Sequence, residues 1–120
     1  MAGGVPAELT RLSATEAVVL LEQGEVSPLE MVHAAEARIR DVEPSLNALP
    51  TTCFERARSH AQALMQGERS EASGLPGWLG GLPVAIKDLA EVAGVRTTYG
   101  SPIYRDHVPE ESHPLVKRIE

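Results

Sequence analysis

The first half of the chain carries apolar residues at the three- and four-residue spacing that forms one face of a helix. We expect one such helix over residues 28–42 and another over residues 53–65. The apolar positions of the first are Val32, Ala35, Ile39 and Val42. Those of the second are Ala57, Ala61 and Leu64. Because each helix has one apolar side, the pattern predicts a helical layer that covers another part of the protein.

Hydroxyl residues mark where helices begin. A serine or threonine followed three positions later by glutamate satisfies two free backbone N–H groups at a helix N-terminus. The pairs of this kind are Ser13 with Glu16, Ser27 with Glu30, and Thr52 with Glu55. The first pair predicts a helix over residues 14–23 that ends at Gly24, since glycine readily adopts the left-handed conformation of a helix C-terminus. A further helix is expected near the end of the chain, with Ser112 as its N-cap and Pro114 in its first turn.

The second half of the chain has a different pattern. Residues 67–81 are rich in Gly, Ser, Pro and Glu and predict a loop. A short apolar run then predicts a strand over residues 82–87, and residues 92–98 form a second candidate strand. Two short strands do not make a stable sheet, so an α/β fold would need further strands from other sequence.

Composition and charge restrict the partners. The chain has 120 residues, 42% of them hydrophobic but only 3% aromatic, so a core would consist mainly of Ala, Val and Leu and would be marginally stable. A net charge of −6 and the lack of a lysine and arginine cluster argue against direct binding of nucleic acid. No stretch is long enough to span a membrane, and the N-terminus does not resemble a secretory signal. We therefore expect a cytoplasmic protein with no membrane partner.

Neither cysteine nor histidine indicates a metal site. Cys53 is the single cysteine, which excludes an internal disulfide, and we expect it to fill a core. The histidines are scattered along the chain at His33, His60, His107 and His113. Their spacing does not match that of metal ligands on one helix, so we expect no metal and no cofactor.

A lysine at the end of the apolar run is the best candidate for chemistry. Burial disfavours the charged ammonium group and lowers the pKa of a lysine, which allows it to act as a base. From its spacing alone, Lys87 is more simply a solvated strand end or an ion-pair partner. Its neighbour Asp88 would point to the opposite face of a strand, so we expect Asp88 to contact solvent or backbone.

Several segments of the chain, in order, resemble the N-terminal part of the amidase signature family, the serine hydrolases that cleave amides with a Ser-Ser-Lys triad. The most specific is a Gly-x-Pro-x-x-x-Lys-Asp pattern over residues 81–88, followed by Thr-x-Gly-Ser over residues 98–101. The other matching segments are residues 12–16, 24–30, 38–40 and 46–48, together with Gly94 and Thr97. The chain is therefore identified as a member of this family.

The resemblance implies a role for Lys87. In the family, this lysine is the general base that deprotonates a bridging serine held by a cis peptide bond, which activates the nucleophilic serine. The products form through an acyl-serine intermediate, without metal or cofactor, from a small-molecule amide. The implied fold is α/β, with a mixed sheet sandwiched by helices. Residues 1–120 would supply the N-terminal part of one amidase domain, namely its helical layer and first strands.

The resemblance also implies what the chain lacks. The two catalytic serines and a Gly/Ser-rich signature follow the lysine in the family, but the 33 residues after Lys87 contain no such stretch. We expect the 120-residue chain alone to be inactive and interpret it as the N-terminal fragment of an amidase. Two alternatives stay open: the amidase subunit of a tRNA-dependent amidotransferase, and a non-catalytic remnant that at most binds a partner. The substrate-binding residues are unknown, and a homodimer is left open.

Overall fold

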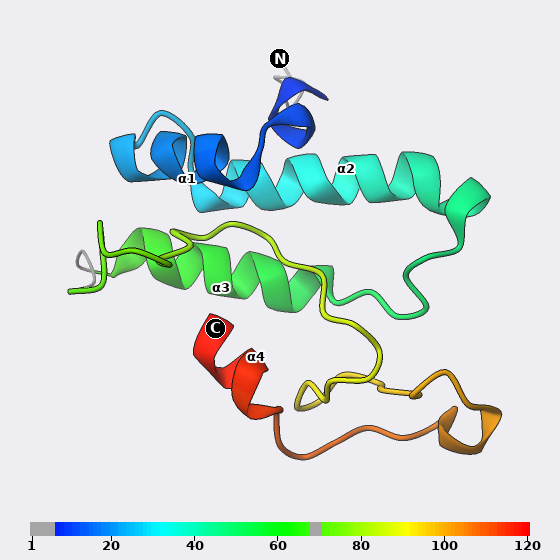
Figure 1. The fold of residues 1–120 in the computed structure, drawn as a ribbon. Helices are drawn as coiled ribbons and strands as arrows, with labels where there is room; N and C mark the ends of the chain where they lie inside the picture. The colour runs from blue at the N-terminus through cyan, green and yellow to red at the C-terminus, as the bar shows by residue number, and fades with distance from the viewer. Residues whose placement is uncertain (1–6, 68–70) are drawn as a thin grey trace. The chain divides into compact units, whose positions relative to one another are not determined.

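The computed structural model describes residues 7–67 and 71–120 (Figure 1). The helical elements in this part of the chain are η1 (Ala7–Arg11), α1 (Ala14–Gln23), α2 (Pro28–Leu46), α3 (Phe54–Gln66), η2 (Pro102–Tyr104) and α4 (Pro114–Ile119). They belong to two compact units. The first contains the described residues up to Leu46 together with Phe54–Pro83, and the second contains Asn47–Cys53 and Val84–Glu120.

Helix α1 begins and ends where the sequence predicts. The Ser13 side chain accepts a hydrogen bond from the Glu16 N–H at 3.3 Å, and the Glu16 carboxylate accepts one from the Ser13 N–H at 2.8 Å. Gly24 ends the helix with φ 71°, in the left-handed conformation. These contacts confirm the predicted helix, because its capping interactions lie within a few residues of its ends.

Helix α2 is longer than predicted. Ser27 and Glu30 form the same reciprocal pair at its start, with the Glu30 carboxylate 2.8 Å from the Ser27 N–H. The helix continues past the expected end at residue 42 and includes Pro44 in its last turn. Its apolar stripe ends earlier than its backbone hydrogen bonding, and Asn47 then leaves the helix with φ 49°.

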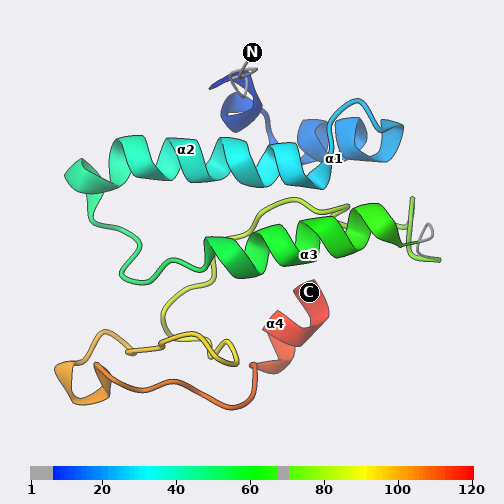
Figure 2. The ribbon, with the colours of Figure 1, turned by 180° about the vertical axis from the view of Figure 1, so that it is seen from behind.

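Helices α2 and α3 form an antiparallel pair in the first unit, and Figure 2 shows this pair from behind. Arg58 on α3 contacts Glu36 on α2 and Glu55 on its own helix. Arg40 lies 5.9 Å from the centre of the Phe54 ring, within the range of a cation–π contact. At the third expected cap, α3 begins at Phe54 and the carboxylate of Glu55 bonds to Arg58.

The core of the first unit is aliphatic, as the composition predicts. Ala17, Leu21 and Met31 are buried together, and the side chains packed against them are Leu9, Leu12, Val26 and Leu82. Gly81 brings the chain against the start of α2: a Cβ at this position would lie 2.7 Å from the Pro28 ring, and its φ is +97°. A glycine is therefore required there for both space and conformation.

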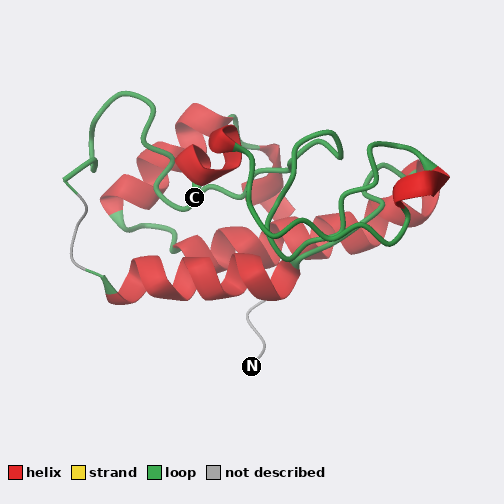
Figure 3. Cartoon of the chain, turned by 90° about the horizontal axis from the view of Figure 1, so that it is seen from below, coloured by secondary structure: helices red, strands yellow, loops and turns green. Residues whose placement is uncertain are grey.

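The predicted strands are not seen. Residues 82–87 have no regular secondary structure, and Val92 and Val95 form only an isolated antiparallel bridge. Figure 3 shows helices and loops but no strand in the described ranges. A strand requires a neighbouring strand for its backbone hydrogen bonds, and residues 7–67 and 71–120 supply none. The helical part of the predicted α/β fold is thus present, whereas its first strands are wrong for this chain. The loop predicted over 67–81 is seen as turns over 71–81, and residues 68–70 lie outside the described residues.

The second unit is held by bonds between distant loops. The Gly94 N–H donates to Pro109 at 2.9 Å, and the Thr97 N–H donates to His107 at 3.0 Å. Helix α4 begins one residue later than expected, because its N-cap is His113. The hydroxyl of Ser112 instead accepts a hydrogen bond from the Ala93 N–H at 2.9 Å. The expected cap residue therefore connects two loops.

Candidate functional site

Lys87 is the first residue of a turn in the second unit. The turn is closed by a hydrogen bond from the Ala90 N–H to the Lys87 carbonyl oxygen at 2.9 Å. The Lys87 side chain is exposed. The burial that would favour a neutral lysine is therefore not provided by residues 7–67 and 71–120. The catalytic role of Lys87 stays a prediction.

The neighbouring carboxylate connects the two motifs that carry the family resemblance. Asp88 accepts a hydrogen bond from the Thr98 N–H at 2.8 Å and another from the Thr98 hydroxyl. These bonds, led by that of the hydroxyl, lower the pKa of Asp88. Asp88 thus contacts backbone, as expected, and it joins the Lys-Asp segment to the Thr-x-Gly-Ser segment ten residues later.

The Thr-x-Gly-Ser segment forms a tight turn. The Ser101 N–H donates to the Thr98 carbonyl at 2.9 Å, and the intervening Tyr99 and Gly100 have φ values of 52° and 69°. The Thr98 hydroxyl also accepts a hydrogen bond from the Gly100 N–H, at 3.2 Å. The Ser101 hydroxyl accepts one from the Ile103 N–H at 3.3 Å. Both hydroxyls thus have the local turn-forming role typical of such residues near glycine.

A second carboxylate in this region contacts two aromatic rings. Glu91 accepts a hydrogen bond from the Tyr99 hydroxyl and lies 3.2 Å from His107 Nε2. The bond to Glu91 raises the pKa of Tyr99 to about 12. The bonds from Tyr99 and then His107 lower the pKa of Glu91. The Tyr99 ring also packs against Tyr104, with centroids 5.0 Å apart, and stacks on His107 at 5.9 Å.

Sequence reasoning missed this cluster because its members are eight and sixteen residues apart. No helical or strand periodicity brings such positions together, since the contact depends on the path of the loop. The only signal was the position of Tyr99 inside the Thr-x-Gly-Ser pattern.

Arg96 has a structural role. Its guanidinium donates to the Thr51 hydroxyl at 3.3 Å, to the Pro50 carbonyl at 3.2 Å and to the Arg105 carbonyl at 3.0 Å. These bonds attach the segment Asn47–Cys53 to the loop that precedes η2 within the second unit. Arg96 and Arg105 line an open pocket of about 320 Å³ together with Thr98, Gly100, Ser101 and Pro102.

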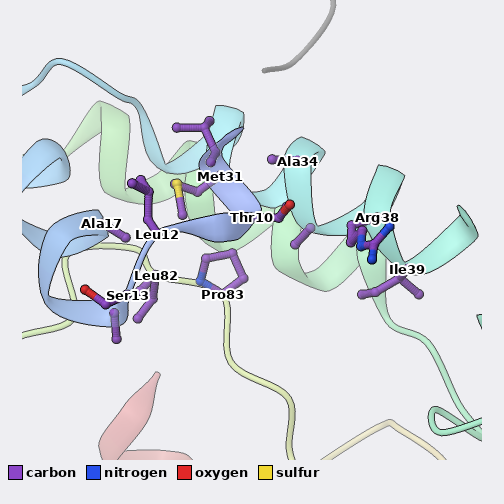
Figure 4. Close-up of a pocket in the computed structure, with 13 residues that line it drawn as sticks. Thr10, Leu12, Ser13, Ala17, Met31, Ala34, Arg38, Ile39, Leu82 and Pro83 are labelled. Atoms are coloured by element: carbon purple, nitrogen blue, oxygen red, sulfur yellow. The ribbon is translucent and has the colours of Figure 1, made fainter. Parts of the chain in front are cut away.

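The first unit contains a larger pocket, of about 400 Å³, between η1, α1 and α2 (Figure 4). Its lining is mostly apolar and includes Leu12, Ala17, Met31 and Ile39. The hydroxyl of Ser13 is engaged in the cap of α1. This pocket can cover an apolar side chain, but its lining includes no pair of groups suited to acid–base chemistry.

The remaining candidates give no site within the described residues. Cys53 is exposed and precedes α3, so the prediction that it fills a core is wrong. Residues 7–67 and 71–120 contain no group of three or more His, Cys, Asp and Glu side chains placed to hold a metal ion. In the same part of the chain, no helix is long and apolar enough to cross a membrane.

The comparisons with known proteins agree with the motifs around Lys87. A family model described as Amidase matches residues 30–120, which include the lysine turn and its contacts. The chain belongs to the amidase signature family. No solved structure matches the chain.

The similar curated proteins have a more specific name, because each is a subunit of glutamyl-tRNA(Gln) amidotransferase. The protein of Anaeromyxobacter dehalogenans is 37% identical over 117 residues, which is 94% of this chain and 23% of that protein. The protein of Persephonella marina is 34% identical over 113 residues, again 94% of this chain and 23% of that protein. That of Roseiflexus sp. is 36% identical over 112 residues, covering 93% and 22%. The chain thus spans less than a quarter of the length of these relatives.

These relatives correct one prediction. Net charge argued against a direct nucleic-acid partner, but the names of the relatives include a transfer RNA. The exclusion is therefore wrong. Its physical basis was a charge of −6 counted over 120 residues, which correspond to 23% of such a protein. The charge of one part does not describe the electrostatic surface of a longer protein or its complex.

Proposed function

We propose that this chain is the N-terminal part of the amidase subunit of a tRNA-dependent amidotransferase. The observation that carries the proposal is the match to a glutamyl-tRNA(Gln) amidotransferase subunit over 94% of the chain at 37% identity. An amidotransferase of this name needs an amide that releases its nitrogen, and glutamine is the amide we propose. The assembly would include glutamyl-tRNA and further subunits.

The lysine turn supports an amide-cleaving site at this position. Asp88 bonds the turn of Lys87 directly to Thr98, so the two motifs of the family pattern lie together in the second unit. This arrangement gives a single anchored segment for the candidate base. The side chain of Lys87 is exposed and thus accessible to groups from other sequence.

In the proposed reaction, Lys87 acts as the general base. The neutral amine takes a proton from a bridging serine, which in turn takes the proton of a nucleophilic serine. The serine oxygen bonds to the amide carbon, and the carbon–nitrogen bond breaks as ammonia leaves. Water then hydrolyses the acyl-serine to glutamate and free serine. Both serines would come from sequence outside residues 1–120, and that sequence would also have to bury Lys87.

The first experiment measures the intact mass of the natural protein, detected through a peptide that contains Lys87. We expect a mass several times the 12.9 kDa of this chain. A mass of 12.9 kDa would contradict catalysis and favour the non-catalytic binding module.

The second experiment measures ammonia release from glutamine by the purified protein, alone and with its co-purifying subunits. We expect release that depends on those subunits and increases with glutamyl-tRNA. Hydrolysis of simple amides without any partner would instead support a free amidase acting on a small molecule. That second candidate is favoured by the family model, whose description is Amidase. A homodimer and a cytoplasmic location stay predictions.

A further inference from the structure

We propose that Asp88 is a positioning residue for Lys87, and that it acts by bonding to Thr98. Glu91 supports the same segment through Tyr99. This inference rests on the proposed function, because the placement of Lys87 affects turnover only if Lys87 is the base.

The backbone of Lys87 is anchored, although its side chain is not. Among residues 7–67 and 71–120, Lys87 Nζ has no hydrogen-bond or ion-pair partner. The direction of the side chain is therefore set by the turn of residues 87–90, which is closed at 2.9 Å by the Ala90 N–H. Whatever holds this turn also sets where the amine can reach.

Asp88 holds the turn with both of its carboxylate oxygens. One accepts the Thr98 N–H at 2.8 Å, and the other accepts the Thr98 hydroxyl. Hydrogen bonds to an ionised acceptor are about twice as strong as neutral ones. Two bonds to one residue also restrict rotation, so Asp88 sets the orientation of the turn as well as its distance from Thr98.

Glu91 makes a second connection at the far end of the segment. Its carboxylate accepts the hydroxyl of Tyr99, the residue after Thr98. Tyr99 has a φ of 52°, an uncommon conformation for a residue with a side chain. Such strain persists only where surrounding contacts maintain it, and it is often found at functional sites. The segment from Asp88 to Glu91 is thus attached at both ends to two adjacent residues of the Thr-x-Gly-Ser turn.

The test compares Thr98→Val with Thr98→Ser in the full-length protein at its natural mass. Valine has the shape of threonine but lacks the hydroxyl, whereas serine keeps it. We expect Thr98→Val to lower kcat about 10- to 100-fold with little change in KM, because a misplaced catalytic group slows the reaction without weakening binding. Thr98→Ser should stay within about threefold of the wild type.

The pH profile separates positioning from a merely structural role. A base that is held less firmly contacts more water, so its pKa rises towards the ordinary value of a lysine. The acid limb of kcat should therefore move to higher pH in Thr98→Val, a change that adds or removes no charge. Thr51→Val is the matched control, because it also removes a hydroxyl bond in the second unit, that to Arg96. It should leave the acid limb unchanged.

The outcomes distinguish this inference from the proposed function. Full activity of Lys87→Ala would overturn the proposed function. An inactive Lys87→Ala together with wild-type kcat and pH profile in Thr98→Val would overturn only the positioning role. If Thr98→Val does not fold, Asp88→Asn is compared with Asp88→Ala. The asparagine can bond Thr98 through its amide and should recover most of the kcat lost in the alanine variant. Equal kcat values in these two variants would also overturn the inference.

Discussion

Lys87 and Lys117 are the two lysines of the chain, and both are exposed in the second unit. Lys117 pairs with Glu111 at 3.4 Å, a surface ion pair of the ordinary kind. Lys87 lies instead in the turn that Asp88 bonds to the Thr-x-Gly-Ser segment. The two lysines thus offer a comparison between a structural cation and a candidate base.

We predict that Lys87→Ala and Lys87→Arg both lower kcat by about 10³-fold or more in the full-length protein. Arginine keeps the charge and length of the side chain but stays protonated, so it cannot act as the base. Lys117→Ala should retain wild-type turnover. The measurement is ammonia release under saturating amide. Near-normal turnover of Lys87→Arg would show that position 87 needs only a positive charge.

Tyr99 provides a pH-dependent contact. Its pKa is raised to about 12 by the bond to Glu91, so the folded state holds the phenol proton more tightly than the unfolded chain, where tyrosine titrates near 10. This contribution to stability is fully present below about pH 10 and is lost as the pH rises towards 12.

We therefore predict that NMR titration of the Tyr99 ring gives a pKa near 12, and that Glu91→Gln moves it back towards 10. The Tyr104 ring serves as an internal control, since it packs on Tyr99 but is not the residue bonded to Glu91. An unchanged Tyr99 titration in Glu91→Gln would contradict the bond as the cause of the shift.

Individual helices owe their ends to local bonds and their packing to small residues. The reciprocal pairs at Ser13 and Ser27 define where α1 and α2 begin. Gly81 has a different role, because it lets the chain pass against the first residue of α2. This glycine opens the Gly-x-Pro-x-x-x-Lys-Asp pattern, so its place in the pattern has a packing reason.

We predict that Gly81→Ala destabilises the first unit more than Gly74→Ala does. Both glycines have positive φ, so both substitutions carry the backbone cost of about 1 kcal/mol. Only at position 81 would the new Cβ meet another group, the Pro28 ring at 2.7 Å, which adds about 1–3 kcal/mol of overpacking. Urea unfolding followed by circular dichroism measures the difference. Equal losses in the two variants would argue against close packing at Gly81.

The chain as a unit of 120 residues exposes many large apolar side chains. The most exposed are Ile103 at 86%, Leu46 at 64%, Leu75 at 59% and Leu89 at 56%. Its buried hydrophobic residues are mainly Ala and Val, with one leucine and one methionine. A core of this size supports only marginal stability, and such surfaces favour association.

We predict that the 120-residue chain alone binds an apolar fluorescent dye, associates at high concentration and releases no ammonia from glutamine. The full-length protein should bind less dye per mole, because the remaining sequence would cover these side chains. Dye fluorescence and light scattering provide the measurements. A monomeric chain without dye binding would show that the exposed side chains need no cover.

Several features could be predicted from the sequence alone because their causes are local. The helix over 14–23, the start of α2 at Pro28 and the turn role of Thr98 and Ser101 depend on neighbours within a few residues. Family membership followed from the order of residues in the pattern around Lys87. Each of these can be inferred without knowing which distant parts of the chain meet.

Other features required the folded chain, because they depend on contacts between distant residues. The predicted strand over 82–87 had no neighbouring strand for its backbone groups, and Lys87 was therefore exposed rather than carried by a buried strand. Glu91 met Tyr99 and His107 only because the loop reverses direction between them. Backbone and side-chain bonds across such separations are set by the path of the whole loop. Residue spacing cannot supply that path, whereas it does supply the caps and stripes of the helices.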